Sequence, residues 1–123
     1  LMNQLLKSAQ RLPPQFHYAP RELSGLPVME RHLSDLKGCY RDTAAYDAAL
    51  AAEDSLLYTV ASATPADGDG QMHYGLGVIY PGMIGDEYYL TKGHLHSTRE
   101  AAEIYVGLKG EGAMLLELSQ MCR

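Results

Sequence analysis

A pair of histidines separated by one residue, His94 and His96, constrains the local fold of this chain more than any other feature. Side chains two positions apart point to the same face of a β-strand, whereas on a helix they diverge by roughly 200°. The two imidazoles can therefore meet one ion only if this segment is extended. A short polar connection then allows a following strand to return and to bring Glu103 to the same ion.

Two imidazoles and a carboxylate with open coordination positions are typical of a divalent transition-metal site that also holds a substrate. A His-x-His pair followed by an acid is also common by chance. The next segment, 103–116, favours the metal hypothesis because it reads as two short strands around a glycine-rich turn, with Glu103 and Tyr105 on one face and apolar residues on the other. Tyr105 then either points into the pocket or packs with its hydroxyl at the rim.

The rest of the sequence predicts an all-β domain with a helical annex. Strand-like runs rich in β-branched and aromatic residues lie at 56–63, 74–80 and 87–92. Asp42 is an N-cap candidate for an alanine-rich helix over 43–52. Residues 1–37 contain four prolines and no sustained period, which predicts a short N-terminal element followed by an extended arm.

Size and charge agree with one soluble domain. The 123 residues fall in the single-domain range, and a net charge of −5 without any Lys/Arg run argues against a nucleic-acid surface. A small anionic substrate needs only a local group of donors and is not excluded. Two cysteines are too few for a disulfide framework, and residues 1–11 lack the long apolar core of a signal peptide or membrane span. We therefore expect a cytoplasmic protein with no membrane partner.

Several of these residues together resemble the first conserved motif of the cupin superfamily, namely Gly93, His94, His96, Glu103, Gly107 and Gly112. Longer stretches at 31–38, 80–96 and 102–112 are similar to the cupin-type glucose-6-phosphate isomerases, and the similarity runs from about Val28 to Leu116. The resemblance implies an antiparallel double-stranded β-helix, or jelly roll, with an extended N-terminal arm and one short helix. It also implies a single cupin domain over 1–123.

The resemblance implies a metal-dependent enzyme that interconverts glucose 6-phosphate and fructose 6-phosphate in glycolysis and gluconeogenesis. His94, His96 and Glu103 would hold one divalent ion, iron(II) by family analogy, although manganese, nickel and zinc suit the same ligands. Glu103 and Tyr105 would carry the catalysis. We expect Glu103 to act both as ligand and as proton shuttle, which requires that substrate loosens its coordination to the cation.

By position, the family's phosphate-binding donors match Tyr58, Thr91 and the backbone at Gly93. From the residues alone, Tyr58 reads first as a half-buried strand tyrosine and Gly93 as a β-bulge. The chain departs from some family members at Gly77, where they carry a further phosphate-binding threonine.

In the family, a fourth ligand, a histidine, comes from a second motif several tens of residues beyond the first. We therefore expect these 123 residues to represent part of a cupin, incomplete at the C-terminal end. Full-length relatives are homodimers, which makes the N-terminal arm a candidate exchanged element. Two other functions stay open: a metal-dependent cupin oxygenase, and a non-catalytic module that binds a sugar phosphate.

Overall fold

The computed structural model describes residues 15–17, 22–63, 73–94 and 103–115. Two units divide the chain, one extending to Gly93 and the other beginning at His94. The elements of the first unit are, in chain order, β1 (Gln15–His17), β2 (Glu22–Ser24), β3 (Val28–His32), the 3-10 helix η1 (Leu33–Leu36), α2 (Thr43–Ala52), β4 (Leu56–Ala63), β5 (Tyr74–Ile79), β6 (Met83–Ile84) and β7 (Glu87–Tyr88). In the second unit, the described residues form neither helix nor strand.

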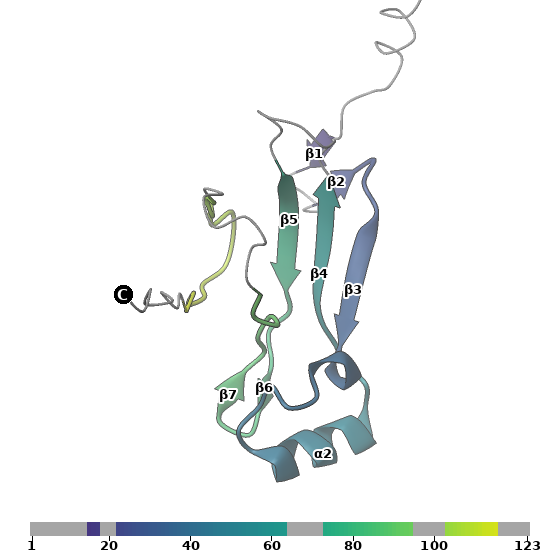
Figure 1. Cartoon of the computed structure of the whole chain (residues 1–123), viewed down its shortest axis with the longest axis vertical. Coiled ribbons are helices and arrows are strands. Elements are labelled where there is room, and N and C mark those ends of the chain that lie inside the picture. Colours follow the sequence, from purple (N-terminus) through teal and green to yellow (C-terminus); the bar gives the residue numbers. More distant parts are fainter. Residues whose placement is uncertain (1–14, 18–21, 64–72, 95–102, 116–123) are drawn as a thin grey trace, which may run out of the picture. The chain divides into compact units, whose positions relative to one another are not determined.

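The strands of the first unit form three antiparallel sheets. The β1–β2 and β6–β7 pairs are hairpins, and β3, β4 and β5 form a three-stranded sheet with β4 in the centre. The three long strands lie side by side, with α2 and the β6–β7 hairpin at one end (Figure 1). The described residues are thus mostly antiparallel strands with one short α-helix, as an all-β fold requires.

A β-bulge at the end of β3 sets the position of the core. Arg31 pairs with Tyr58, but the next residue, His32, pairs with Leu56, so Leu57 is an extra residue in β4. Such a bulge breaks the strict alternation of side chains. Leu57 and Tyr58, although adjacent in sequence, are accordingly both buried in the same core.

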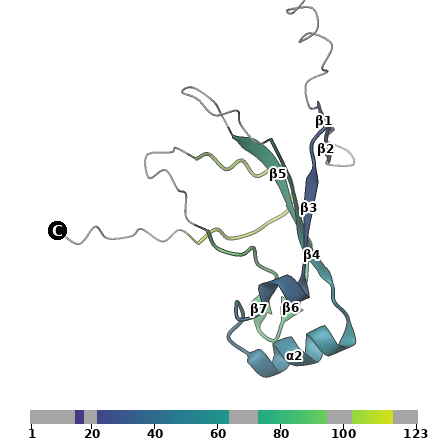
Figure 2. The ribbon, with the colours of Figure 1, turned by 45° about the vertical axis from the view of Figure 1, so that its right-hand side comes forward.

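The core lies where η1, α2 and the β6–β7 hairpin meet the end of the sheet (Figure 2). Its buried members are Leu33, Leu36, Tyr40, Tyr46, Leu57, Tyr58 and Ile84. The three leucines are almost completely buried. Burying a leucine side chain stabilises a fold by about 1.5–3 kcal/mol, so these residues dominate the packing energy of this layer.

Hydrogen bonds to carboxylate side chains fix both helices of this layer. The Asp42 carboxylate accepts from the Ala45 backbone N–H at 2.9 Å, which confirms the predicted N-cap of the alanine-rich helix over 43–52. At η1, the Ser34 N–H and hydroxyl both donate to the Asp54 carboxylate at 2.8 Å. These two hydrogen bonds, with the backbone one contributing most, lower the pKa of Asp54.

The predicted strands are confirmed at 56–63 and, ending one residue early, at Tyr74–Ile79. The prediction of a strand over 87–92 is wrong beyond Tyr88. The Tyr89 N–H donates to the Gly82 carbonyl at 2.9 Å, in register with the β6–β7 pairs. The Lys92 N–H donates to the Tyr58 hydroxyl at 3.4 Å and is therefore not available to a ladder. The predicted strand over 103–108 is likewise not formed.

The prediction of a simple extended arm is also too coarse. Its described residues form the β1–β2 hairpin, then β3 as an edge strand of the main sheet, and then η1. Closure of the strands into a jelly roll stays a prediction. None of the helices in the described residues is long and apolar enough to cross a membrane.

Candidate functional site

Tyr58 connects the central strand to the segment that precedes the histidines. Its side chain is buried, and its hydroxyl accepts a hydrogen bond from the Lys92 backbone N–H at 3.4 Å. Thr91 and Gly93 flank Lys92 in sequence. The structure therefore brings the three predicted phosphate-binding positions, Tyr58, Thr91 and Gly93, into one neighbourhood. A hydroxyl has one proton and two lone pairs, so Tyr58 still has its proton to donate.

The residues at 91–93 are exposed, whereas the two residues before them are anchored. Tyr89 and Leu90 pack against the core, and the Tyr89 ring lies directly over Gly82. A Cβ atom built at Gly82 would come within 2.4 Å of that ring, so any other residue there would displace the ring. At Gly93 a Cβ atom would meet nothing within 4 Å. The backbone at Gly93 is therefore open to a ligand.

An ion-pair cluster holds the β6–β7 hairpin to the start of α2. The Glu87 carboxylate accepts from the Arg41 backbone N–H at 2.8 Å and lies 3.3 Å from the Arg41 guanidinium Nε. Asp86 is 3.6 Å from the same guanidinium, but both of those groups are largely exposed. Gly85, with φ of 59°, makes the turn of the hairpin beside Asp42. This cluster fixes the strand from which the segment 89–94 departs.

Glu103 and Tyr105 meet in the second unit although no strand forms there. A hydrogen bond to the Glu103 carboxylate raises the pKa of the Tyr105 hydroxyl, with smaller contributions from burial and from the Glu103 charge. The sequence places both residues on one face of a strand but does not predict this hydrogen bond. Both side chains are exposed, as is His94. His96 lies outside the described residues.

The donor types at these positions suit a divalent transition metal, since imidazole and carboxylate are its usual nitrogen and oxygen ligands. Among the residues that the structure describes, no three His, Cys, Asp or Glu side chains gather as a metal site. Because the predicted triad includes His96, it stays a prediction.

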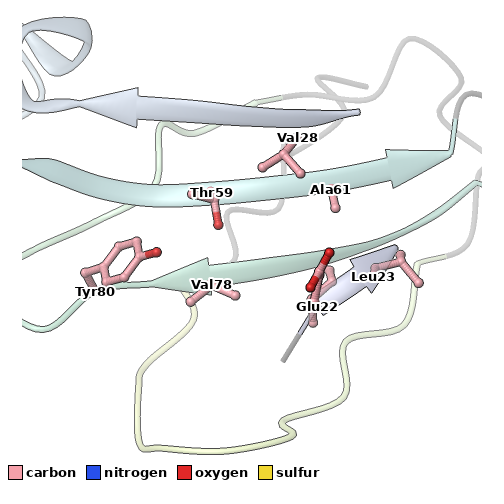
Figure 3. A pocket seen from close by; sticks show the side chains of 8 residues that line it. Glu22, Leu23, Val28, Thr59, Ala61, Val78 and Tyr80 are labelled. Atoms are coloured by element: carbon pink, nitrogen blue, oxygen red, sulfur yellow. The ribbon is translucent and has the colours of Figure 1, made fainter. Parts of the chain in front are cut away.

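A shallow groove of about 210 Å³ lies on the main sheet, and its lining residues are shown in Figure 3. Thr59 and Ala61 of β4 and Val78 of β5 form its floor, and Glu22 borders it. Side chains alternate along a strand, so this face is the opposite one from Tyr58. The groove is therefore separate from the candidate phosphate site.

Sequence reasoning missed the contribution of Arg41 and Glu87 to this site. The two residues are 46 positions apart, and no local pattern pairs them. A long-range contact of this kind follows only from the packing of the hairpin against α2.

A model of the glucose-6-phosphate isomerase family matches residues 30–122 of the chain. Proteins named glucose-6-phosphate isomerase are similar in sequence. The one from Pyrococcus abyssi is 37% identical and that from Thermococcus kodakarensis 41% identical, each over 95 residues, or 77% of this chain and 50% of the relative. The one from Sinorhizobium medicae is 39% identical over 89 residues, covering 72% of this chain and 42% of the relative. The chain thus spans about half the length of the curated relatives that it matches.

Proposed function

This chain belongs to the glucose-6-phosphate isomerase family, and we propose that it serves in the reversible conversion of glucose 6-phosphate to fructose 6-phosphate. The observation that carries the proposal is the family match over 30–122, which includes every residue of the candidate site. The contact between the Tyr58 hydroxyl and the Lys92 backbone supports it, because it brings the candidate phosphate donors together.

The phosphate group would bind at Tyr58, Thr91 and Gly93. Two hydroxyls and an exposed backbone N–H can all donate to phosphate oxygens, and neutral donors suit an anion that keeps part of its charge. The buried ring of Tyr58 limits the motion of its hydroxyl. Thr91 and Gly93 lie on an exposed segment that a ligand can reach.

His94, His96 and Glu103 would hold a divalent cation, with iron(II) the first candidate and manganese, nickel or zinc as alternatives. When bound, such a cation supplies positive charge that stabilises the oxygen anion of an enediolate. The fold proposed for the domain is the cupin jelly roll, for which β3 and β5 provide open edges within the described residues. Homodimer formation in the cytoplasm belongs to the same proposal.

Glu103 would transfer the proton between C2 and C1 of the sugar. The proton leaves C2, returns at C1, and the O2 hydroxyl proton moves to O1, so that no atom is gained or lost. The Tyr105 hydroxyl donates to the Glu103 carboxylate and so orients it. This hydrogen bond would leave the second carboxylate oxygen directed at the substrate.

Replacing Glu103 by glutamine tests this role because glutamine keeps the shape and loses the basic oxygen. We expect Glu103→Gln to reduce kcat by at least about 100-fold, as loss of a general base usually does. Bound metal should be measured in the same preparation. Retention of both metal and substantial activity would rule out Glu103 as the proton shuttle.

The assignment as a whole is tested by metal-dependent formation of fructose 6-phosphate. The protein is stripped with a chelator, refilled with iron(II) or manganese, and assayed with glucose 6-phosphate. Activity that disappears with the chelator and returns with metal is the expected result. Oxygen consumption without isomerisation would favour the oxygenase alternative, and binding of hexose phosphate without turnover would favour a binding module.

A further inference from the structure

The sheet face that carries Tyr58 also carries an arginine. In the antiparallel pairing of β3 with β4, Arg31 is the direct partner of Tyr58, and on the other side of β4 Tyr58 is paired with Ile79. Directly paired residues lie on the same face, with Cβ atoms about 4.5–5.5 Å apart. The Arg31 and Tyr58 side chains therefore start as immediate neighbours.

The direction of Tyr58 identifies this face as the one that meets the 91–93 segment. Its hydroxyl accepts from the Lys92 N–H, so the side chain reaches from β4 to that backbone. Thr59 and Ala61 point the other way, into the groove of Figure 3. An arginine that leaves β3 on the Tyr58 face therefore starts beside the tyrosine whose hydroxyl contacts the 91–93 segment.

The charge of Arg31 is uncompensated among the described residues. Both ion pairs in this part of the chain use Arg41, and none uses Arg31. Glu30, its acidic neighbour, belongs to the opposite face because it pairs with Thr59. Arg31 is half-buried as a residue, and a bound anion would offset the cost of desolvating its guanidinium group.

The same face has free space. Gly77 lies opposite Val60, the next inward-facing position after Tyr58, and a Cβ atom built there would meet nothing within 4 Å. No hydroxyl is available at that position. A guanidinium presents a planar fork of N–H donors that matches phosphate in a bidentate arrangement, and it can supply more hydrogen bonds than a single hydroxyl.

We propose that Arg31 binds the phosphate group of the substrate, together with Tyr58 and the 91–93 segment. The inference rests on the proposed function, because it takes a hexose phosphate as the ligand. It also predicts that a ligand without the phosphate gains nothing from Arg31.

The test compares Arg31→Gln and Arg31→Lys with Lys37→Gln, an exposed residue whose loss changes net charge equally. The affinities for glucose 6-phosphate, for inorganic phosphate and for glucose are measured by calorimetry, together with KM and kcat. Loss of a hydrogen bond to a charged group weakens binding by about 10- to 100-fold. We expect this loss in Arg31→Gln for both phosphate ligands, with glucose binding and kcat little changed and with Lys37→Gln like the wild type.

Arg31→Lys keeps the charge and the aliphatic stem but loses the fork, so an intermediate affinity is expected for it. Unfolding curves of all variants separate a binding defect from a folding defect. Wild-type phosphate affinity in a folded Arg31→Gln would overturn the inference, as would a wild-type protein that binds neither phosphate ligand. Phosphate binding that depends on Arg31 without any turnover would support the inference and refute the isomerase proposal.

Discussion

At the scale of single residues, two buried tyrosines of the core differ in one hydrogen bond. The rings of Tyr40 and Tyr46 stack with centroids 5.9 Å apart. The Tyr46 hydroxyl donates to the Leu33 carbonyl at 2.9 Å. The buried Tyr40 hydroxyl completes no hydrogen bond within the described residues. Burial raises its pKa, and the nearby Leu90 backbone partly offsets that rise. The two tyrosines therefore allow the stability contribution of a hydrogen-bonded buried hydroxyl to be compared with that of a buried hydroxyl without a partner.

Replacing each tyrosine by phenylalanine should give opposite results. Tyr46→Phe leaves the Leu33 carbonyl without its donor, and we expect it to lower the free energy of unfolding by about 1–2 kcal/mol. Tyr40→Phe removes a buried group that gains no partner, so its effect should be neutral or stabilising. Urea denaturation at neutral pH measures both. Equal destabilisation by the two variants would contradict this account.

Alkaline stability should depend on the same two hydroxyls. Burial is the main cause that raises the pKa of both above the ordinary value of 10.0. A raised pKa means that the native state holds the proton more tightly than the unfolded chain. The resulting stability is full below pH 10 and is lost as the pH rises through the native pKa values. The free energy of unfolding, measured at increasing pH, should therefore decrease above pH 10. The decrease should be smaller in the variant that carries both Tyr40→Phe and Tyr46→Phe.

At the scale of elements, the two glycines of β5 have different surroundings. A Cβ atom at Gly75 would lie 2.7 Å from the Ala61 carbonyl oxygen, whereas one at Gly77 would meet nothing. Gly75→Ala should therefore force the strands apart and cost about 1–3 kcal/mol. Gly77→Ala should stabilise the strand by about 0.4–1 kcal/mol through the unfolded state. Thermal unfolding of the two variants measures the contrast, and a destabilising Gly77→Ala would show that this space is not free.

The contact between the hairpin and α2 should depend on Glu87 far more than on Asp86. The Glu87 side chain is only 16% exposed and accepts a backbone hydrogen bond, whereas that of Asp86 is 82% exposed. We expect Glu87→Gln to cost about 1 kcal/mol, because the hydrogen bond becomes neutral, and Asp86→Asn to cost less than about 0.5 kcal/mol. Unfolding free energies of both variants, measured at low and high salt, test this ranking. A larger loss of unfolding free energy in Asp86→Asn than in Glu87→Gln would contradict it.

The elements that the sequence predicts correctly are those determined by residues within the element itself. Asp42 and the following alanines specify α2, and the run Tyr58, Thr59 and Val60, one aromatic and two β-branched residues, favours β4. The strand predicted to continue to Lys92 ends at Tyr88, and the Lys92 amide donates instead to the hydroxyl of Tyr58, which lies 34 positions away in sequence. Of the site, the sequence predicts neither the hydrogen bond between Tyr105 and Glu103 nor the pairing of Arg31 with Tyr58. The pairing depends on the strand register, which changes at the bulge after Arg31.

At the scale of the whole molecule, the two units differ in backbone hydrogen bonding. In the first unit, strands and α2 enclose a buried core, whereas residues 103–115 of the second form no helix or strand. Amide exchange is slow where opening requires unfolding and fast where no ladder exists. We expect slow exchange in β4 and α2 and fast exchange over 103–115. Mass-spectrometric exchange tests this, and strong protection of 103–115 in the metal-free protein would contradict it.

Tyr58 belongs both to the core and to the candidate site. If Tyr58 leaves its position in the core, the candidate site is therefore disturbed as well. Heating should therefore not weaken substrate affinity gradually ahead of melting, since the hydroxyl keeps its position for as long as the core stays packed. Selection for growth at a higher temperature could then improve the packing around Tyr58 and extend the working range of the site without changing a group that contacts the sugar.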